Sequence, residues 1–163
     1  MNHDFSASPN RVPWPPIIYL GVALAAVGLQ RIWPLHPMPG AWAPWLLMAG
    51  AAVAGLGLAL DLAAMMAMRR ARTNILPHRA ADQLVTEGVF GLTRNPIYLG
   101  NTLLLFGAGL VLASPWMMGG ALVAAWLCDL LAIRREERHL ASRFGQAFAG
   151  YAERVPRWFR WRR

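Results

Sequence analysis

The feature that most constrains this chain is the stretch 95–133, which carries a single charged residue, Asp129. The dipeptide Ser114-Pro115 divides the stretch into two apolar runs, 97–114 and 116–133. Each run is close to the length that crosses a bilayer as a helix, and so short a break makes the two helices antiparallel. The stretch therefore predicts a membrane hairpin.

Two more apolar segments precede the hairpin, at about 16–33 and 42–68. In the second of these, Gly50, Gly55 and Gly57 suit close packing against another helix. With 56% hydrophobic and only 15% charged residues, the chain is too apolar for an ordinary soluble domain of 163 residues. We expect an all-α integral membrane protein with about four transmembrane helices, forming one membrane-embedded domain over 1–163.

The part of the chain after the hairpin is amphipathic. Apolar side chains recur there at helical spacing, and polar ones lie between them. The pattern predicts a cytoplasmic amphipathic C-terminal helix that continues from the fourth span and ends near Arg154, because Pro156 cannot continue a helix. The apolar residues of this pattern are Leu140, Phe144, Ala147, Phe148 and Tyr151.

The distribution of arginine predicts the orientation. Five arginines lie in 69–94 and nine follow Ile133, whereas the loop 34–41 and the Ser114-Pro115 turn have none. The positive-inside rule places the arginine-rich segments, and with four spans both termini, in the cytoplasm. All sixteen basic residues are arginine, a composition typical of a GC-rich genome, so we expect a multi-pass protein of a bacterial inner membrane.

The charge and the cysteine content exclude several classes. A net charge of +8 suits nucleic acid, but the arginines flank membrane segments and do not line a recognition element, so we expect membrane lipids and no nucleic acid as partners. The single Cys128 excludes an intramolecular disulfide and a zinc site of several cysteines. We expect no metal, and no obligatory protein partner is evident.

Two polar clusters flank the hairpin. The first runs from Arg94 to Gly100, as Arg-Asn-Pro-Ile-Tyr-Leu-Gly, and the second starts at Glu136-Glu137. Farther along lie Tyr151 and the segment Arg-Val-Pro-Arg, which begins at Arg154. Both clusters fall on the predicted cytoplasmic side, so they can converge on one pocket. Charged groups are poorly tolerated in hydrocarbon, which favours a functional site over a lipid-exposed surface.

These motifs, in this order and over about 73–159, resemble the isoprenylcysteine carboxyl methyltransferase family, whose relatives include membrane phospholipid N-methyltransferases. The resemblance implies a membrane-embedded methyltransferase that uses S-adenosylmethionine (SAM). One departure concerns the segment after Phe144-Gly145, where the family pattern has two tyrosines and this chain has Phe148 before Tyr151.

The chemistry of SAM suits the same residues. Carboxylates accept hydrogen bonds from ribose hydroxyls or pair with an ammonium group, an arginine clamps a carboxylate, and tyrosine rings offer faces to adenine or a sulfonium. A glycine lets a ligand or a neighbouring helix approach closely. The residues expected to bind the cofactor are Arg94, Asn95, Pro96, Tyr98, Gly100, Glu136, Glu137 and Tyr151. Arg154 and Arg157 are the candidate catalytic residues, with Arg154 favoured.

Other interpretations stay open. The acidic pair can be an interfacial ion cluster, Asn95 a helix cap and the tyrosines interfacial aromatics. The intramembrane carboxylates Asp61 and Asp129 can be functional or structural. The methyl acceptor is expected to be lipophilic, with a carboxylate or an amine as the accepting group. An NADPH-dependent sterol-type membrane reductase and a non-enzymatic membrane subunit are the competing classes.

Overall fold

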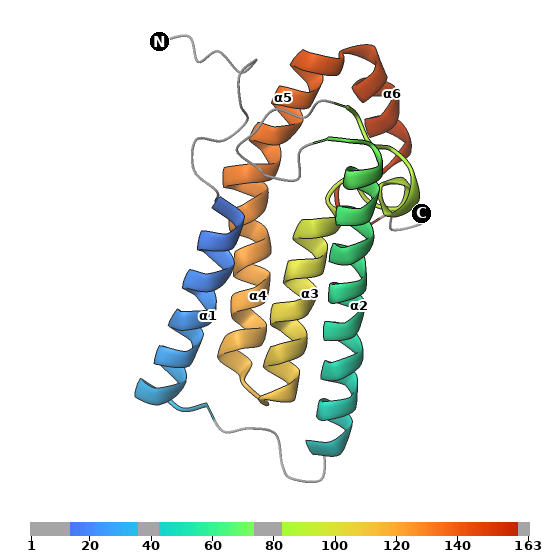
Figure 1. The fold of residues 1–163 in the computed structure, drawn as a ribbon. Helices are drawn as coiled ribbons and strands as arrows, with labels where there is room; N and C mark the ends of the chain where they lie inside the picture. Colours follow the sequence, from blue (N-terminus) through green and yellow to red (C-terminus); the bar gives the residue numbers. More distant parts are fainter. Residues whose placement is uncertain (1–13, 36–42, 74–82, 160–163) are drawn as a thin grey trace, which may run out of the picture.

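The computed structural model describes residues 14–35, 43–73 and 83–159, and within them the chain is helical apart from short connections. Four helices lie side by side as a bundle, and two shorter helices cover one end of it (Figure 1). The bundle helices are α1 (Trp14–Ile32), α2 (Ala43–Arg70), α3 (Pro96–Val111) and α4 (Pro115–Cys128). The chain continues through η3 (Asp129–Ile133) into α5 (Arg134–Phe144) and α6 (Gln146–Arg154), and a short 3₁₀ turn, η2 (Gly88–Gly91), precedes α3.

The predicted hairpin of α3 and α4 is present. Pro96 opens α3 and Pro115 opens α4, positions where the missing amide hydrogen of proline removes no helical hydrogen bond. The Ser114 hydroxyl accepts a hydrogen bond from the Met117 amide and caps α4. Ala113 takes a positive φ of 45° to turn the chain. The two helices pack against each other along their length.

Helices α2 and α3 form the most extensive interface of the bundle. A Cβ atom added at Gly57 would lie 2.6 Å from the Gly100 carbonyl oxygen, and one at Gly50 would lie 2.7 Å from the Gly107 carbonyl oxygen. The two backbones are therefore in direct contact, as predicted for Gly50 and Gly57. Gly55 faces open space instead. This α2–α3 glycine seam, defined by Gly50, Gly57, Gly100 and Gly107, fixes the height of α3 relative to α2.

Among the described residues, three helical segments are long and apolar enough to cross a membrane, namely Trp14–Ile32, Pro44–Arg70 and Pro115–Phe144. The apolar helix α3 has 16 residues, about 24 Å at 1.5 Å per residue, which is less than the roughly 30 Å of a hydrocarbon core. The described part of the chain is thus helical with segments suited to a membrane, and a count of four spans stays a prediction. The last long helix continues past residue 133 to Phe144, beyond the apolar run predicted as the fourth span.

That long helix contains one irregular turn and is followed by a change of direction. Residues Asp129–Ile133 form a π-helical turn, which joins α4 to α5 without a break in the chain direction. At Gly145 the backbone takes φ 50° and ψ −123°, a conformation open to glycine, and α6 starts in a new direction. The single amphipathic helix predicted for this region is therefore two helices, and the second ends at Arg154.

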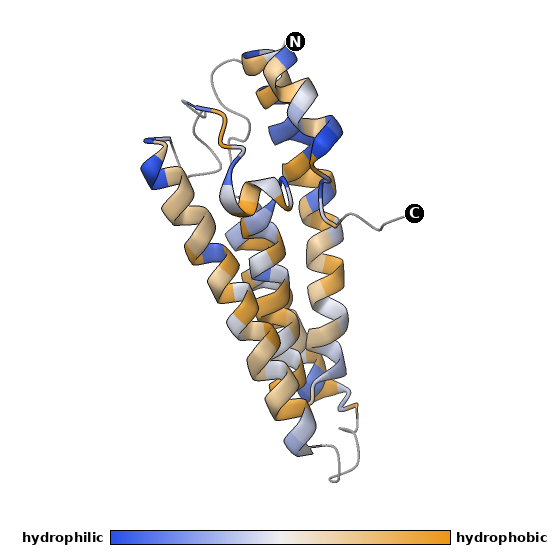
Figure 2. Cartoon of the chain, turned by 90° about the vertical axis from the view of Figure 1, so that its right-hand side faces the viewer, coloured by the Kyte–Doolittle hydropathy of each residue, from blue (hydrophilic) through white to orange (hydrophobic). Residues whose placement is uncertain are grey.

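The hydrophilic residues gather at the end of the bundle where α5 and α6 lie, and the helical shafts below are mostly hydrophobic (Figure 2). The same end receives the start of α1, the end of α2 and the start of α3 (Figure 1). The fold therefore brings together segments that lie far apart in the sequence, at the boundary of the apolar bundle.

Candidate active site

The carboxylate of Glu137 is the centre of the polar end. It lies 3.1 Å from Nη2 of Arg94 and accepts a hydrogen bond of 3.0 Å from Nε of Arg157, which also donates through Nη2. Only 15–16% of the Arg94 and Glu137 side chains is exposed. Pairing with Glu137 raises the pKa of Arg157, so this guanidinium stays charged. Three sequence segments thus meet at one carboxylate.

Arg157 also contacts a second carboxylate. Its Nη1 lies 3.2 Å from Oδ1 of Asp129, whose Oδ2 pairs with Nε of Arg134 at 2.8 Å. The sequence left open whether Asp129 is functional or structural. In the structure it pairs with two arginines at the π-turn. The arrangement places the Arg157 guanidinium between α5 and the π-turn.

Hydrogen bonds to two backbone carbonyls of the tail connect it to the segment before α3. The Arg94 amide donates to the Pro156 carbonyl at 3.0 Å, and the Asn95 side-chain amide and the Thr93 hydroxyl both donate to the Arg157 carbonyl at 3.0 Å. Asn95 is buried and makes no side-chain cap hydrogen bond to α3. In this structure Asn95 holds the tail. The sequence reasoning missed Thr93, whose hydroxyl also accepts a hydrogen bond from the backbone N–H of Asn95.

Glu136 lies in a different environment from its neighbour. Its Oε2 accepts a hydrogen bond of 3.1 Å from the Tyr98 hydroxyl, its one hydrogen-bond partner among the described residues. The Tyr98 carbonyl in turn accepts from the Tyr19 hydroxyl at 2.9 Å and from Thr102 at 2.8 Å. Sequence reasoning missed Tyr19 and Thr102, because nothing in the apolar pattern of α1 indicates which of its residues faces α3.

Aromatic side chains of α6 complete the other wall. The Tyr151 hydroxyl donates to the Phe90 carbonyl at 2.7 Å, and burial raises the pKa of Tyr151 to about 12. Phe148, which replaces the first tyrosine of the family pattern, packs edge-on against Tyr151 with ring centroids 6.4 Å apart. Cζ of Arg94 lies 6.0 Å from the Phe148 ring centroid, a cation–π distance. Arg94 is thus held between a ring and a carboxylate.

The remaining predicted site residues divide into two groups. Pro96 and Gly100 are buried at the first turns of α3, and Gly100 contacts α2 rather than an open pocket. Arg154 is exposed and its Nε donates to the carbonyl of Gly150 in the same helix. The structure therefore brings Arg157, and not the favoured Arg154, to the cluster.

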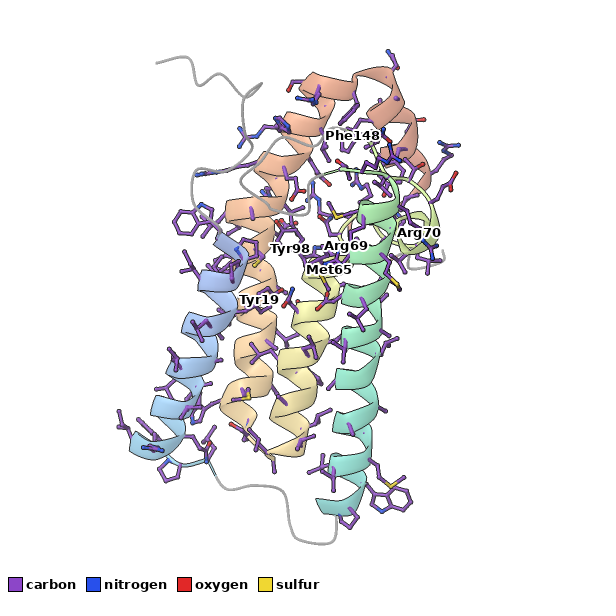
Figure 3. The ribbon with its side chains drawn as sticks, viewed as in Figure 1. Tyr19, Met65, Arg69, Arg70, Tyr98 and Phe148 are labelled. Carbon is purple, nitrogen blue, oxygen red and sulfur yellow. The ribbon has the colours of Figure 1, made fainter. Side chains whose placement is uncertain are left out.

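A small pocket lies among these groups, with about 70 Å³ of free volume. The acidic pair, Arg94 and Asn95 line one side, and the segment 83–90 and the aromatics of α6 line the other. Figure 3 shows Tyr98, Met65 and Arg69 at the same end of the bundle, beneath Phe148, with Arg70 on the outer side of α2. The lining residues are Met68, Thr73, Gln83, Leu84, Val85, Phe90, Arg94, Asn95, Glu136, Glu137, Leu140, Phe148 and Tyr151.

The comparisons with known proteins find membrane methyltransferases and one metal-resistance protein. A family model described as phospholipid methyltransferase matches residues 45–147, more than half of the chain. Protein-S-isoprenylcysteine O-methyltransferase B of Arabidopsis thaliana is 31% identical over 114 residues, which are 69% of this chain and 58% of that protein. The cobalt-zinc-cadmium resistance protein CzcN of Cupriavidus metallidurans is 38% identical over 81 residues, or 50% of this chain and 37% of that protein.

A solved structure is similar over a larger part of the chain. The eukaryotic intramembrane Ras methyltransferase, an isoprenylcysteine carboxyl methyltransferase, superposes with a TM-score of 0.64 at 26% identity, covering 90% of this chain and 52% of that one. The chain therefore spans about half the length of the relatives that it matches.

Proposed function

This chain belongs to the phospholipid methyltransferase family, together with the isoprenylcysteine carboxyl methyltransferases, and from that premise we propose that it is an integral membrane methyltransferase. The proposed reaction transfers the methyl group of SAM to a lipophilic acceptor at the cytoplasmic face. The acceptor is an amphiphile of the surrounding bilayer whose reactive group is a carboxylate or an amine. The membrane is proposed to be a bacterial inner membrane, with both termini in the cytoplasm.

The observation that carries the proposal is the difference between the two adjacent carboxylates. Glu137 is neutralised by Arg94 and Arg157, whereas Glu136 has a hydroxyl and no cation as its partner among the described residues. A half-buried carboxylate without a cation favours a positively charged ligand. SAM offers two positive groups, an ammonium and a sulfonium, so Glu136 is the proposed counter-charge.

Other groups in the pocket fit the rest of the cofactor. Nε of Arg94 is buried and has no hydrogen-bond partner among the described residues. A buried guanidinium donor without an acceptor is unfavourable, and the carboxylate of SAM can supply the acceptor. The Phe148 and Tyr151 rings provide the apolar surface that a purine ring requires. The donor and acceptor set therefore fits SAM.

The free volume of the pocket does not yet match the cofactor. Pockets for molecules of this size measure several hundred Å³, whereas this pocket holds about 70 Å³. We infer that the wall formed by residues 83–90 moves outward when SAM binds. The Tyr151–Phe90 hydrogen bond is the contact that ties this wall to α6.

In this reaction the protein forms no covalent bond to the substrate, and its role is to bind and align the reactants. Bound SAM supplies an electrophilic methyl carbon, and the acceptor must lie in line with it at about 3–3.5 Å. Glu136 holds the positive ligand, Arg94 fixes its carboxylate, and Arg157 keeps Glu137 and the tail in place. The apolar bundle below excludes water from the reacting atoms. Arg154 stays a predicted catalytic residue, but it is exposed and is not among the residues that line the pocket.

Isothermal calorimetry on the detergent-purified protein tests the proposal. We expect binding of SAM and of its demethylated product, and no binding of NADPH. Glu136→Gln should weaken SAM binding about tenfold, the loss of one charge-assisted interaction, whereas Glu153→Gln on the exposed face of α6 is the matched control. Binding of NADPH without any response to SAM would contradict the methyltransferase and favour the reductase.

A further inference from the structure

Asp61 is a carboxylate inside the second apolar helix that the proposed cofactor site does not use. It lies within the candidate span Pro44–Arg70, and only 8% of it is exposed. Its Oδ1 has no hydrogen-bond partner among the described residues. An unpaired acidic group is expensive in an apolar helix bundle, and such groups face functional partners as a rule.

The neighbouring helix makes room for this carboxylate. A Cβ atom added at Gly100 would lie 2.1 Å from Oδ1 of Asp61, so only glycine permits the contact. The α2–α3 glycine seam therefore accommodates the carboxylate of Asp61 at a position where an apolar side chain would need no hydrogen-bond partner. The contact with Gly100 supplies no N–H or O–H donor to Oδ1, so it leaves the carboxylate unsatisfied.

Asp61 lies on the side of α2 that leads to the cofactor pocket. Met65 and Met68 follow it at intervals of four and seven residues, which places the three on one helical face. Met68 lines the pocket, about 10 Å farther along the helix at 1.5 Å per residue. Figure 3 shows Met65 of that face at about the same level of the bundle as Tyr98 of α3, whose hydroxyl contacts Glu136. Asp61 is therefore about one to two helical turns from the pocket, toward the membrane.

Helix α1 is the other element near Asp61. Helix α1 packs on α4 and α2 packs on α3, but α1 and α2 form no comparable interface in the described part of the chain. Tyr19 of α1 lies within electrostatic reach of Asp61, and its hydroxyl is occupied by Tyr98 and Thr102. Near Tyr19, Oδ1 of Asp61 is therefore an acceptor of hydrogen bonds that has no partner among the described residues.

We propose that Asp61 binds the amino group of the methyl acceptor and acts as its general base, which makes the acceptor a lipophilic amine. The inference rests on the proposed function and narrows its acceptor to one class. A second carboxylate beside Asp61 would be repelled, whereas an ammonium group pairs with it in surroundings that strengthen the attraction.

The reaction balances with these groups alone. An ammonium group, R–NH₃⁺, gives one proton to the Asp61 carboxylate and becomes a neutral amine. The amine nitrogen then attacks the methyl carbon of SAM, an N–C bond forms, and the C–S bond breaks with its electron pair remaining on sulfur. The products are a methylammonium group and a neutral thioether, and the proton on Asp61 leaves to water when the product departs. A general base of this kind contributes about 10²–10⁴ in rate.

The test compares two single-chain probes, hexadecylamine and hexadecanoic acid, with methyl-labelled SAM and the full chain in detergent. We expect label in the amine and none in the acid. Asp61→Asn keeps the size of the side chain and should lower amine methylation at least a hundredfold and weaken amine binding about tenfold. Its affinity for SAM, measured by calorimetry, should stay unchanged. Glu153→Gln again serves as the control.

Each other result overturns the inference. Label in hexadecanoic acid and not in the amine would assign the acceptor to carboxylates and leave the proposed function intact. Loss of SAM binding in Asp61→Asn would make the residue a structural part of the α2–α3 glycine seam. Undiminished amine methylation in Asp61→Asn would show that Asp61 is not the general base. Failure of the unaltered protein to bind SAM would instead contradict the proposed function itself.

Discussion

The α2–α3 glycine seam and the polar end of the bundle are held together by different forces. The seam has no side chains between its backbones at Gly50 and Gly57, and it depends on the close fit of two surfaces. The polar end depends on directional contacts from Arg94, Glu137 and Arg157. The first kind of interface tolerates no added atom, and the second tolerates no lost charge. Substitutions should therefore separate folding from ligand binding.

The largest effect is expected in the seam. Gly57→Val would push a branched side chain against the Gly100 carbonyl and the Leu104 amide, 2.6 and 2.9 Å from the added Cβ. Overpacking against backbone should destabilise the fold by about 3 kcal/mol. Thermal unfolding in detergent measures the change, and Gly55→Ala, at a position with open space around it, is the control. A Gly57→Val protein as stable as the Gly55→Ala protein would show that the seam does not hold the bundle.

The next largest effect is expected at the centre of the polar end. Glu137→Gln leaves Arg94 and Arg157 without their shared carboxylate. Loss of hydrogen bonds between charged groups costs about 2 kcal/mol, roughly thirtyfold in SAM affinity. Calorimetry measures the affinity, and thermal unfolding should change less than in Gly57→Val. If the two variants lose the same stability and Glu137→Gln binds SAM normally, the division between the regions fails.

A smaller effect should follow from Arg157→Lys. Lysine keeps the charge but cannot hold Glu137 and Asp129 at once through a planar fork. We expect turnover to fall about tenfold, or about 1.4 kcal/mol, with normal insertion and purification. Arg154→Lys, at the exposed end of α6, should change turnover little. Turnover that falls in Arg154→Lys alone would restore the preference drawn from sequence.

The smallest effect should come from Tyr151→Phe. This change removes the hydroxyl that donates to the Phe90 carbonyl at 2.7 Å and keeps the ring. One neutral hydrogen bond is worth about 1 kcal/mol, so amide hydrogen exchange in 83–91 should become about fivefold faster. Exchange measured with and without SAM also tests whether that wall moves on binding. Equal exchange in the two proteins would mean that other contacts hold the wall.

The two regions also differ in how far sequence could predict them. Hydropathy and the Ser114-Pro115 break predicted the antiparallel α3–α4 hairpin, because a short polar break in a long apolar run has few alternatives. Glycine spacing predicted the use of Gly50 and Gly57 but not the open surroundings of Gly55. The spacing of residues predicts which of them share a helical face, but it does not predict which neighbouring helix that face contacts.

At the polar end, the sequence predicted which residues lie together but did not predict which pairs of them are in contact. Arg94, the acidic pair and Tyr98 do lie together, but Asn95 serves the tail through the Arg157 carbonyl. The preference for Arg154 rested on its position three residues after Tyr151, on the same helical face. Both residues do lie in α6, but Tyr151 is buried and Arg154 is exposed. Contacts such as those of Thr93 and Tyr19 depend on backbone positions far along the chain, and local patterns carry no signal for them.

The π-turn at Asp129–Ile133 acts as an angular correction in the long helix. Eight residues separate Asp129 from Glu137, which in an uninterrupted α-helix would rotate their side chains about 80° apart. A π-turn absorbs one extra residue, so the two carboxylates are in phase to within about 20° and one guanidinium contacts both. Deleting a single residue from this turn would restore a regular α-helix and keep Asp129 in phase with Glu137 to within about 20°, because seven residues at about 100° each complete nearly two turns. Relatives that keep the double contact on a regular α-helix should therefore have one residue fewer between the two carboxylates.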